Sequence, residues 1–314
     1  MENIFFNRNI ISTEDFSRSD FDFLLNYAEE IKKNPERFSK SMDGKIMAPL
    51  FFEQSTRTSL SFQMAMLQMG GRVLDFDVGG SSLGKGETIS DTIRMIKGYK
   101  ADAVVIRHPS GGSAQLAADI LNIPLINAGD GPNQHPTQTM LDLFTVKEIK
   151  GKIDGVEVGL VGDLKYGRTV HSLLIALSKY EGCKIYFVSP EVLKVPETFL
   201  QILRNKGIQF SEHKLDELQD IVKLVDVLYM TRIQRERFPE GIEGEQQYKE
   251  VSEAYCLKPE MLEGVKAGFK IMHPLPKVSE IDVSIDDSNY AYYFEQAANG
   301  LHIRKALLYL TTTK

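Results

Sequence analysis

The stretch Phe51-Phe52-Glu53-Gln54-Ser55-Thr56-Arg57-Thr58-Ser59 lies where a predicted strand meets a predicted helix. The run before it, residues 45–52, is short and mostly apolar, which is typical of a buried strand. After it, Leu60, Met64 and Leu67 recur at helical spacing up to Gly70-Gly71, a pair suited to a helix stop. The polar block therefore falls at a helix N-terminus.

A helix N-terminus presents backbone N–H groups that lack intrahelical partners, and its dipole favours negative charge. Here Ser55, Thr56 and Thr58 add three hydroxyls, and Arg57 adds a guanidinium group. This combination predicts a site for an anion such as phosphate. Simple N-capping is the alternative, because Ser and Thr are favoured at caps in any case. Capping needs only one hydroxyl, so the pattern favours anion binding.

The composition indicates a globular protein with room for two domains. The chain has 314 residues, of which 42% are hydrophobic and 25% charged. Its 37 Lys and Arg against 43 Asp and Glu give a net charge of −6, so no basic nucleic-acid surface is expected. Cys183 and Cys256 indicate neither a metal cluster nor a disulfide scaffold. We find no signal peptide and no apolar run of membrane-spanning length, and therefore expect a cytoplasmic protein.

Predicted strands and helices alternate along the chain in two series. The strands are expected near residues 45–52, 72–77, 103–106 and 124–127, and then near 156–161, 184–188, 208–210, 225–230 and 267–272. A long helix expected at 135–150 joins the two series, and a helix or helix pair near 290–310 ends the chain. Such alternation is typical of parallel sheets covered on both faces. We expect an α/β fold with two doubly wound parallel-sheet domains joined by interdomain helices.

Cationic residues follow several of the predicted strands. In sheets of this kind, ligands bind beyond the carboxyl ends of the strands. Clustered guanidinium groups without counter-charges are unfavourable, so their convergence predicts a ligand with several negative charges. In the alternative, each arginine pairs with a nearby acid such as Glu53, Asp163 or Glu236. The residues that lie just past a predicted strand are Arg57, Arg107, His135, Arg168, Arg232 and His273.

The sequence offers no evident nucleophile. It contains no Gly-x-Ser-x-Gly elbow, no Cys paired with His, and no His-Glu-x-x-His motif or aspartate cluster for a metal. Gly159–Asp163 follows a strand but lacks the third glycine of the dinucleotide fingerprint, so we expect no cofactor. What remains is catalysis by positioning and by fixed positive charge around a developing oxyanion. Group transfer from an activated phosphate to an amine fits this inventory.

Spaced blocks along nearly the whole chain carry a family resemblance. They are Phe-Phe-Glu-Gln-Ser-Thr-Arg-Thr, Gly-Lys-Gly-Glu-Thr, Arg107-His-Pro, Asn127-Ala-Gly-Asp-Gly, His135-Pro-Thr-Gln, Gly162-Asp-Leu-Lys-Tyr-Gly-Arg, Thr231-Arg-Ile-Gln and His273-Pro-Leu-Pro. In these blocks and their order the chain resembles the aspartate/ornithine carbamoyltransferase family, most closely its members that act on aspartate.

The resemblance implies which residues bind carbamoyl phosphate. Arg57, Thr58, Arg107 and His135 would be catalytic, polarising the carbonyl and stabilising the tetrahedral oxyanion. We expect His135 to act as a neutral imidazole, since the helix N-terminus and the arginines disfavour added positive charge. In the alternative, His135 makes only structural bonds. The implied carbamoyl phosphate ligands are Ser55, Thr56, Arg57, Thr58, Arg107, His135, Gln138 and the backbone carbonyls of Pro274 and Leu275.

The resemblance also implies the acceptor and the reaction. The amine of L-aspartate would attack directly, giving N-carbamoyl-L-aspartate and phosphate without a covalent enzyme intermediate, in an early step of pyrimidine (UMP) biosynthesis. The departing phosphate could accept the amine proton. Residues 1–149 with 290–314 would form the carbamoyl phosphate domain, with the C-terminal helix packing back on it, and residues 150–289 the aspartate domain. The implied aspartate ligands are Lys85, Arg168, Arg232 and Gln234.

The resemblance also implies a homotrimer whose sites lie between subunits, with a neighbour donating the loop that holds Ser81, Ser82 and Lys85. Without the family, Lys85 reads as a solvated loop charge. Either serine could be the binding one, because a single lysine stands before Gly86-Glu87. Regulatory chains and nucleotide effectors stay open.

Further residues bear on the packing and closure of the site. Gln54 and Ser59 depart from commoner choices in the family, which we expect to affect packing more than chemistry. Glu53 is a candidate interdomain tie to Arg168 or Arg237.

Two other functions are alternatives to this one. A carbamoyltransferase for ornithine is the first, but a cationic acceptor should not favour Arg232 and Gln234 beside its distal group, and the His273–Pro276 block lacks the cysteine usual in ornithine enzymes. A non-catalytic anion-binding homologue is the second. Every catalytic position that can be mapped is retained, which favours the aspartate enzyme.

Overall fold

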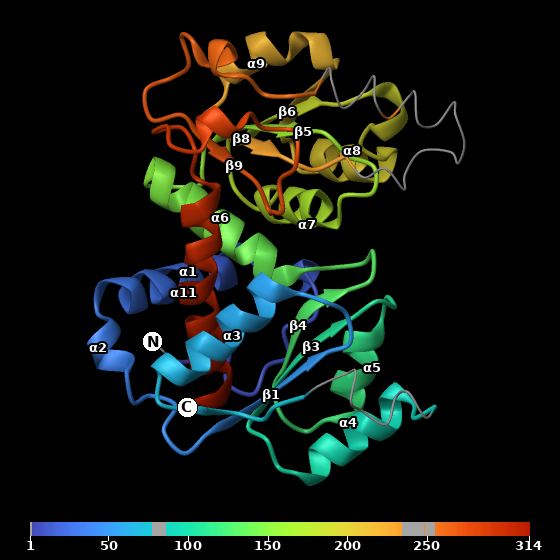
Figure 1. Ribbon diagram of the computed structural model, residues 1–314, viewed down its shortest axis with the longest axis vertical. Coiled ribbons are helices and arrows are strands. Elements are labelled where there is room, and N and C mark those ends of the chain that lie inside the picture. Colours follow the sequence, from blue (N-terminus) through green and yellow to red (C-terminus); the bar gives the residue numbers. More distant parts are fainter. Residues whose placement is uncertain (1, 77–85, 234–247, 249–254) are drawn as a thin grey trace. The chain divides into compact units, whose positions relative to one another are not determined.

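The computed structural model describes residues 2–76, 86–233, 248 and 255–314. It contains two compact units, which are Met1–Leu141 with Ala298–Lys314, and Asp142–Ala297. The divisions fall within α6 (Pro136–Lys150) and α11 (Tyr293–Thr312). Each unit holds a parallel sheet with helices, which confirms the expected pair of parallel α/β domains (Figure 1). Among the described residues, no helix is long and apolar enough to cross a membrane.

The sheet of unit 1 has the order β2-β1-β3-β4, with every neighbouring pair parallel. Strand β1 supplies a run of four buried residues in its middle, as the apolar stretch before Glu53 predicts. The register places Phe51 of β1 opposite Arg107 of β3, so the two cationic motifs leave the same edge of the sheet. The strands are β1 (Ile46–Phe51), β2 (Arg72–Val73), β3 (Ala103–His108) and β4 (Leu125–Asp130).

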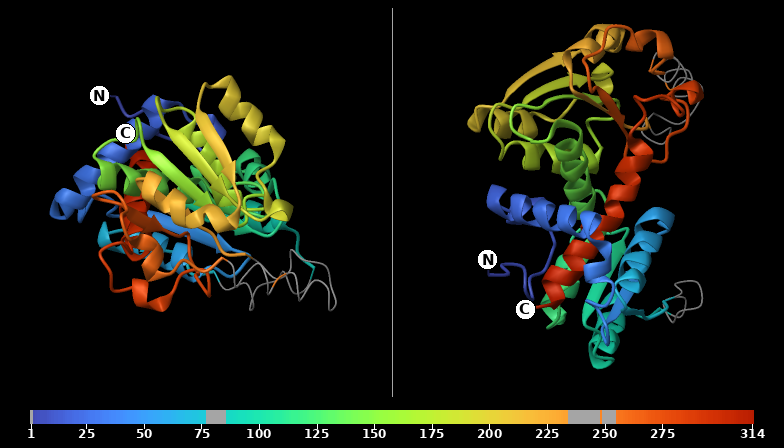
Figure 2. Two further views of the ribbon diagram at one scale, coloured as in Figure 1. Left: turned by 90° about the horizontal axis from the view of Figure 1, so that it is seen from above. Right: turned by 90° about the vertical axis from the view of Figure 1, so that its left-hand side faces the viewer.

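Helices cover both faces of this sheet. On one face, α4 (Ile89–Gly98) and α5 (Ser113–Ile120) bury a cluster that includes Ala48, Ile93 and Ile106. The other helices pack against one another, with Tyr27 of α1 stacked on Tyr309 of α11 and Arg304 of α11 over the ring of Phe62 in α3 (Figures 1 and 2). These helices are α1 (Arg18–Lys33), α2 (Pro35–Phe38), α3 (Thr56–Gln68) and the unit 1 part of α11.

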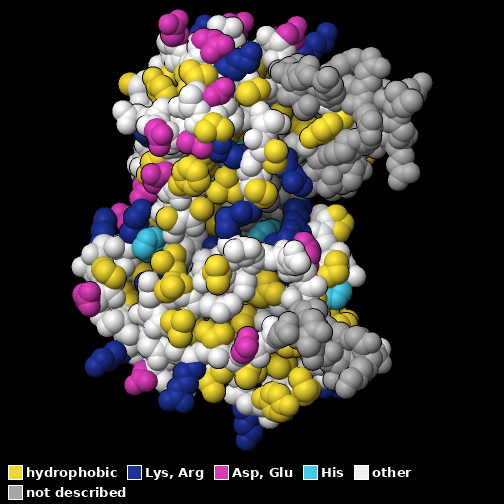
Figure 3. All heavy atoms as spheres, in the orientation of Figure 1, with side chains coloured by type: hydrophobic (Ala, Val, Ile, Leu, Met, Phe, Trp, Pro, Cys, Tyr) yellow, Lys and Arg dark blue, Asp and Glu magenta, His cyan; other side chains and the backbone are white. Residues whose placement is uncertain are grey.

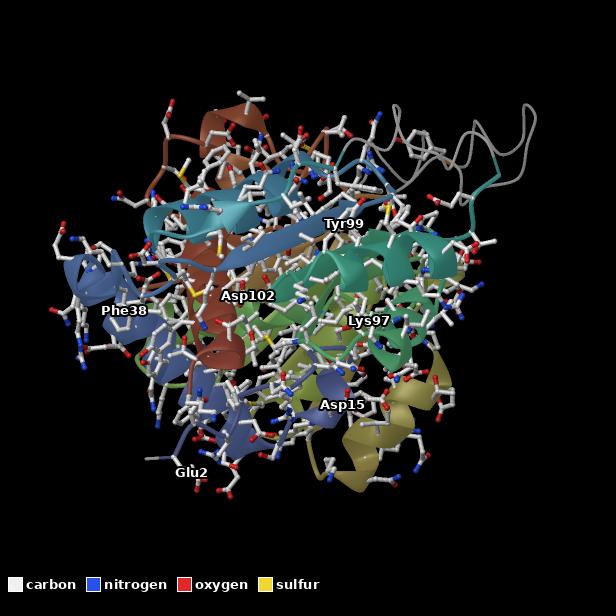
Figure 4. The ribbon with its side chains drawn as sticks, turned by 90° about the horizontal axis from the view of Figure 1, so that it is seen from below. Glu2, Asp15, Phe38, Lys97, Tyr99 and Asp102 are labelled. Atoms are coloured by element: carbon white, nitrogen blue, oxygen red, sulfur yellow. The ribbon has the colours of Figure 1, made fainter. Side chains whose placement is uncertain are left out.

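Polar side chains fix the amino-terminal edge of the unit 1 sheet. Asp102 lies just before β3 and accepts a hydrogen bond from the Ile46 N–H at 2.8 Å, which pins β3 to the start of β1 (Figure 4). Lys97, on α4, donates to the Ile120 carbonyl at 2.7 Å and so satisfies a carbonyl at the end of α5. The amino-terminal edge is thus closed by structural bonds, and the opposite edge carries the candidate site residues.

The sheet of unit 2 has the order β7-β6-β5-β8-β9 and is also parallel. Helices α7 and α8 lie on one face and α9 on the other, which is the doubly wound arrangement (Figure 1). The strands are β5 (Glu157–Val161), β6 (Lys184–Val188), β7 (Gln209–His213), β8 (Val227–Met230) and β9 (Lys270–Met272). The helices are α7 (Arg168–Leu177), α8 (Glu197–Asn205) and α9 (Leu218–Leu224), with short 3-10 turns at Glu191–Leu193, Leu215–Glu217, Pro259–Leu262 and Val283–Ile285.

The structure differs from the sequence-based boundaries in places. Ser12 and Thr13 are typical helix caps and predict one helix that begins there, but the structure has a 3-10 turn, Thr13–Asp15, followed by the separate helix α1. Ser17 explains the break, because its hydroxyl caps α1 by accepting from the Asp20 N–H and its N–H donates back to the Asp20 carboxylate. Strand β3 extends to His108, so Arg107 is the penultimate strand residue and does not lie past the strand.

Candidate active site

Helix α3 begins at Thr56, with Ser55 at its N-cap position. The Ser55 side chain makes no capping hydrogen bond within the part of the chain that the structure describes. Its carbonyl accepts from the Ser59 N–H at 3.1 Å, so the helix ladder starts here. The Ser55 hydroxyl therefore does not act as a simple N-cap. The first-turn N–H groups, the Ser55 hydroxyl and Arg57 together retain the features of an anion site.

Arg107 brings a second guanidinium group to this helix terminus. Its Nη2 donates to Glu53 Oε1 at 2.8 Å, and its Nη1 lies 3.4 Å from the Ala128 carbonyl. Its Nε is buried and lacks a hydrogen-bond partner among the described residues. Partial burial, and then the positive charge of Arg107, lower the pKa of Arg57. Two guanidinium groups therefore lie close together with one carboxylate, which leaves net positive charge for an anion.

The loop before His135 is organised by Asp130, which sequence reasoning named only as part of a motif. The Asp130 carboxylate is 1% exposed. It accepts four hydrogen bonds, at 2.9 Å from Asn127 Nδ2, 3.1 Å from the Gln134 N–H, 2.9 Å from the Gly112 N–H and 3.0 Å from Asn133 Nδ2. Asp130 thus fixes the residue that immediately precedes His135.

Gly131 shows how tightly this loop is packed. Its φ is +55°, and a Cβ there would lie 2.5 Å from the Pro109 carbonyl oxygen. Its N–H donates to the His108 carbonyl at 2.8 Å. Only glycine fits this close approach without strain, so the end of β3 and the loop before His135 form one assembly.

His135 and Gln138 lie at the start of α6, both largely buried at 5% and 8% exposure. The His135 carbonyl accepts from the Gln138 N–H at 3.0 Å, which places both residues in the first turn. Thr137, fully buried, has its hydroxyl 3.5 Å from His135 Nδ1. The structure thus holds His135 in unit 1, the same unit as Arg57 and Arg107.

In unit 2, a buried carboxylate–imidazole pair supports the His273–Pro276 loop. His273 Nε2 lies 2.7 Å from Glu280 Oε1, and the two side chains are 1% and 3% exposed. The Leu275 N–H donates to His273 Nδ1 at 2.7 Å, which places the imidazole proton on Nε2, facing Glu280. Leu275 has a positive φ of 57°, and this bond holds it there. The carbonyls of Pro274 and Leu275 are therefore presented by a braced loop.

A second chain of hydrogen bonds anchors the same loop. The His273 N–H donates to Gln296 Oε1 at 2.7 Å, and Gln296 Nε2 donates to Asp142 Oδ1 at 2.7 Å. The other oxygen of Asp142 accepts from the Tyr229 hydroxyl at 2.9 Å. Because Asp142 and Tyr229 are fully buried, the network is protected from water. Gln296 and Asp142 were missed from the sequence because their contact joins residues 154 positions apart. Glu280 lies only seven residues after His273, but no motif marks the pair.

Arg168 and Arg232 follow β5 and β8, neighbouring strands of the unit 2 sheet, and both are half-buried. Arg168 is the first residue of α7, and Arg232 comes two residues after β8. The Asp163 N–H donates to Thr231 Oγ1 at 2.9 Å, which ties the two loops together. Predictions that lie outside the described residues concern Ser81, Ser82, Lys85, Gln234, Glu236 and Arg237.

The donor set indicates the chemistry of the site. Hydroxyls, helix N–H groups and guanidinium groups bind oxyanions, and no group of three His, Cys, Asp or Glu side chains suited to a metal occurs among the described residues. A family model for the aspartate/ornithine carbamoyltransferase carbamoyl phosphate-binding domain matches residues 8–148, and one for the Asp/Orn-binding domain matches residues 154–311. The chain belongs to this family, which confirms the resemblance seen in the motifs.

Individual relatives with high similarity to this chain are aspartate carbamoyltransferases. The chain is 47% identical over 306 residues to the aspartate carbamoyltransferase catalytic subunit of Chromobacterium violaceum, covering 97% of this chain and 98% of the relative. It is 34% identical to the solved structure of aspartate transcarbamoylase from Trypanosoma cruzi in complex with N-(phosphonacetyl)-L-aspartic acid, with a TM-score of 0.91 and coverage of 99% and 98%. The catalytic subunit of M. jannaschii aspartate transcarbamoylase is 47% identical, with a TM-score of 0.88 and coverage of 96% of each chain.

Proposed function

We propose that this protein transfers the carbamoyl group of carbamoyl phosphate to the amino group of L-aspartate. The products are N-carbamoyl-L-aspartate and phosphate, and the reaction is an early step of pyrimidine biosynthesis. The name aspartate carbamoyltransferase, shared by relatives that cover nearly the whole chain, supports this reaction over the ornithine alternative. The structural observation that carries the proposal is that Arg57 lies in the first turn of α3 while Arg107 lies opposite Phe51, at the end of the strand that leads into α3.

The residues of unit 1 bind and activate carbamoyl phosphate in this proposal. Ser55, Thr56 and Arg57 hold the phosphate through hydroxyls, first-turn N–H groups and a guanidinium group. Thr58, Arg107 and His135 stabilise the negative charge that develops on the carbonyl oxygen. Gln138 binds the carbamoyl amide. The complete set of unit 1 ligands is Ser55, Thr56, Arg57, Thr58, Arg107, His135 and Gln138.

The chemical step is a direct displacement. The neutral amine nitrogen of aspartate attacks the carbonyl carbon, and a tetrahedral intermediate with an oxyanion forms. The bond between that carbon and the phosphate oxygen then breaks, and the departing phosphate accepts the amine proton. Arg168, Arg232 and Gln234 hold the aspartate carboxylates, and the carbonyls of Pro274 and Leu275 accept from the carbamoyl amide.

We propose a cytoplasmic homotrimer in which a neighbouring subunit contributes Lys85 together with Ser81 or Ser82. The exposed side of α3 supports an assembly through unit 1. Leu60, Met64 and Leu67 recur along it with 58%, 46% and 57% exposure, and Figure 3 shows apolar side chains on this face. Exposed apolar side chains that recur along one helix face favour an interface.

An activity assay tests the proposal directly. Purified protein is incubated with carbamoyl phosphate and either L-aspartate or L-ornithine, and the carbamoylated product is identified. We expect N-carbamoyl-L-aspartate and no citrulline, because Arg232 repels a cationic side chain. Citrulline formation would replace aspartate with ornithine as the acceptor, and the absence of both products would favour a non-catalytic homologue.

A further inference from the structure

Tyr255 is buried in unit 2 at the point where β5 and β8 end. Its side chain is 1% exposed. The hydroxyl lies 2.6 Å from the Val161 carbonyl oxygen and 2.6 Å from the Thr231 carbonyl oxygen. The Thr231 N–H donates to the Val161 carbonyl at 2.9 Å and also lies 3.3 Å from the Tyr255 hydroxyl. One phenol therefore bridges the last residue of β5 and the first residue beyond β8.

The two carbonyls that Tyr255 contacts belong to the peptide groups at which the two arginine-bearing loops begin. The Val161 carbonyl is part of the peptide that leads into Gly162, where the loop to Arg168 begins. The Thr231 carbonyl is part of the peptide that leads into Arg232. A peptide group is planar, so holding its carbonyl sets the direction in which the next residue leaves. The Tyr255 hydroxyl therefore contacts the peptide groups that lead into both arginine-bearing loops.

Gly162 makes room for the hydroxyl. Its φ is +113°, and a Cβ there would lie 2.1 Å from the Tyr255 hydroxyl oxygen and 2.6 Å from Thr231 Oγ1. Any side chain at this position would displace the phenol or the threonine. The glycine that opens the Gly162–Arg168 loop is therefore required by a close approach, in addition to its left-handed backbone.

Thr231 extends the same hydrogen-bond network into the loop after β5. Its hydroxyl donates to the Val161 carbonyl at 2.9 Å and accepts from the Asp163 N–H at 2.9 Å. Asp163 in turn accepts from the Tyr166 N–H at 2.9 Å. Burial raises the pKa of Tyr255 far above its usual value, so the hydroxyl keeps its proton and remains a donor.

We propose that Tyr255 is a positioning residue for the acceptor site, acting through Val161 and Thr231 to orient Arg168 and Arg232. This inference rests on the proposed function, in which the two arginines bind the carboxylates of aspartate. Tyr255 does not touch the substrate in this account. Its hydroxyl fixes the spacing of two guanidinium groups, and a dicarboxylate is sensitive to that spacing.

The test is Tyr255→Phe, which removes one oxygen and leaves the ring in the core. We expect the KM for aspartate to rise about tenfold, the effect of losing one buried hydrogen-bond donor, while the calorimetric affinity for carbamoyl phosphate stays unchanged. Gly162→Ala should raise the aspartate KM as well, because its Cβ displaces the same hydroxyl. Tyr293→Phe is the matched control, since Tyr293 is buried in the same core and its hydroxyl bonds Asp286, away from the strand ends.

Hydrogen exchange gives a readout that needs no activity. The Asp163 and Thr231 N–H groups should exchange faster in Tyr255→Phe than in the wild type or in Tyr293→Phe. An aspartate KM within twofold of wild type with unchanged exchange would overturn the inference, and so would an equal rise in KM for Tyr293→Phe. A wild-type protein inactive with aspartate would overturn the proposed function instead, and exchange would still decide whether Tyr255 holds the loops.

Discussion

Replacing Glu280 by glutamine should weaken the loop that carries Pro274 and Leu275. Glu280 Oε1 lies 2.7 Å from His273 Nε2, and Oε2 accepts from the Val278 and Ser279 N–H groups, each at 3.1 Å. All three partners are donors, and glutamine offers only one acceptor oxygen. Its amide N–H₂ must therefore face a donor on one side, whichever way the side chain is turned.

The size of the effect follows from these contacts. A hydrogen bond to a charged group contributes about 1.5–3 kcal/mol, and a buried donor left without an acceptor costs about 1–3 kcal/mol. Glu280→Gln removes the charge that strengthens the hydrogen bond to His273, and it leaves a buried N–H donor without an acceptor. We therefore expect the free energy of unfolding to fall by about 3 kcal/mol. Glu260→Gln, at an exposed site in the same unit, should change it by less than about 0.5 kcal/mol.

The pH dependence gives an independent check. Burial alone would raise the pKa of Glu280, but the hydrogen bonds from His273 and the backbone N–H groups outweigh it and lower the pKa below its usual value. The stabilising contribution is therefore present above the unfolded pKa and is lost as the pH falls through the folded one. Wild type and Glu280→Gln should converge in stability as the medium is acidified below pH 4.5.

Urea unfolding of the full chain, followed by far-UV circular dichroism, measures both quantities. The chain has no tryptophan, so a backbone signal is the suitable probe. Equal stability of Glu280→Gln and wild type at neutral pH would refute the reasoning. A difference in unfolding free energy that stays unchanged in acid would refute the claim that Glu280 is ionised when it accepts the His273 hydrogen bond.

Three other experiments test separate parts of the account. Arg232→Ala should raise the aspartate KM and leave the calorimetric affinity for carbamoyl phosphate nearly intact; an equal loss of both would contradict an acceptor role. Inactive Lys85→Ala and Arg57→Ala chains should regain activity when mixed under subunit exchange, whereas no recovery in verified mixed trimers would place each site within one chain. Asp130→Asn should cost about 1–3 kcal/mol of unfolding free energy, because its amide group faces N–H donors, and should slow turnover through His135, so unchanged turnover would argue against that link.

The fold could be predicted because hydrophobic periodicity is a local signal. The central strands of the two sheets coincide with short apolar runs, whereas the edge strand β7 is mostly polar. The register of β1 and β3 brings Arg57 and Arg107 to one edge of the unit 1 sheet. Boundaries were less predictable. Arg107 and His108 belong to β3 because a partner strand supplies their backbone hydrogen bonds, and polarity alone could not reveal this.

The supporting residues could not be predicted for a different reason. Tyr255 reaches Val161 across 94 residues, and Gln296 reaches Asp142 across 154. Neither has a local motif, so only the folded chain brings the groups together. The sequence suggested that Glu53 might neutralise an arginine, and the structure pairs it with Arg107. Its expected tie to Arg168 or Arg237 stays a prediction.

The central claim is that the N-terminus of α3, with Arg57 and Arg107, binds carbamoyl phosphate. Isothermal titration of carbamoyl phosphate into the wild type and into Arg57→Ala tests it most directly. The account predicts saturable binding to the wild type and none detectable to Arg57→Ala, whose circular dichroism should match the wild type. Near-normal affinity in Arg57→Ala would contradict the assignment of this helix terminus as the phosphate site.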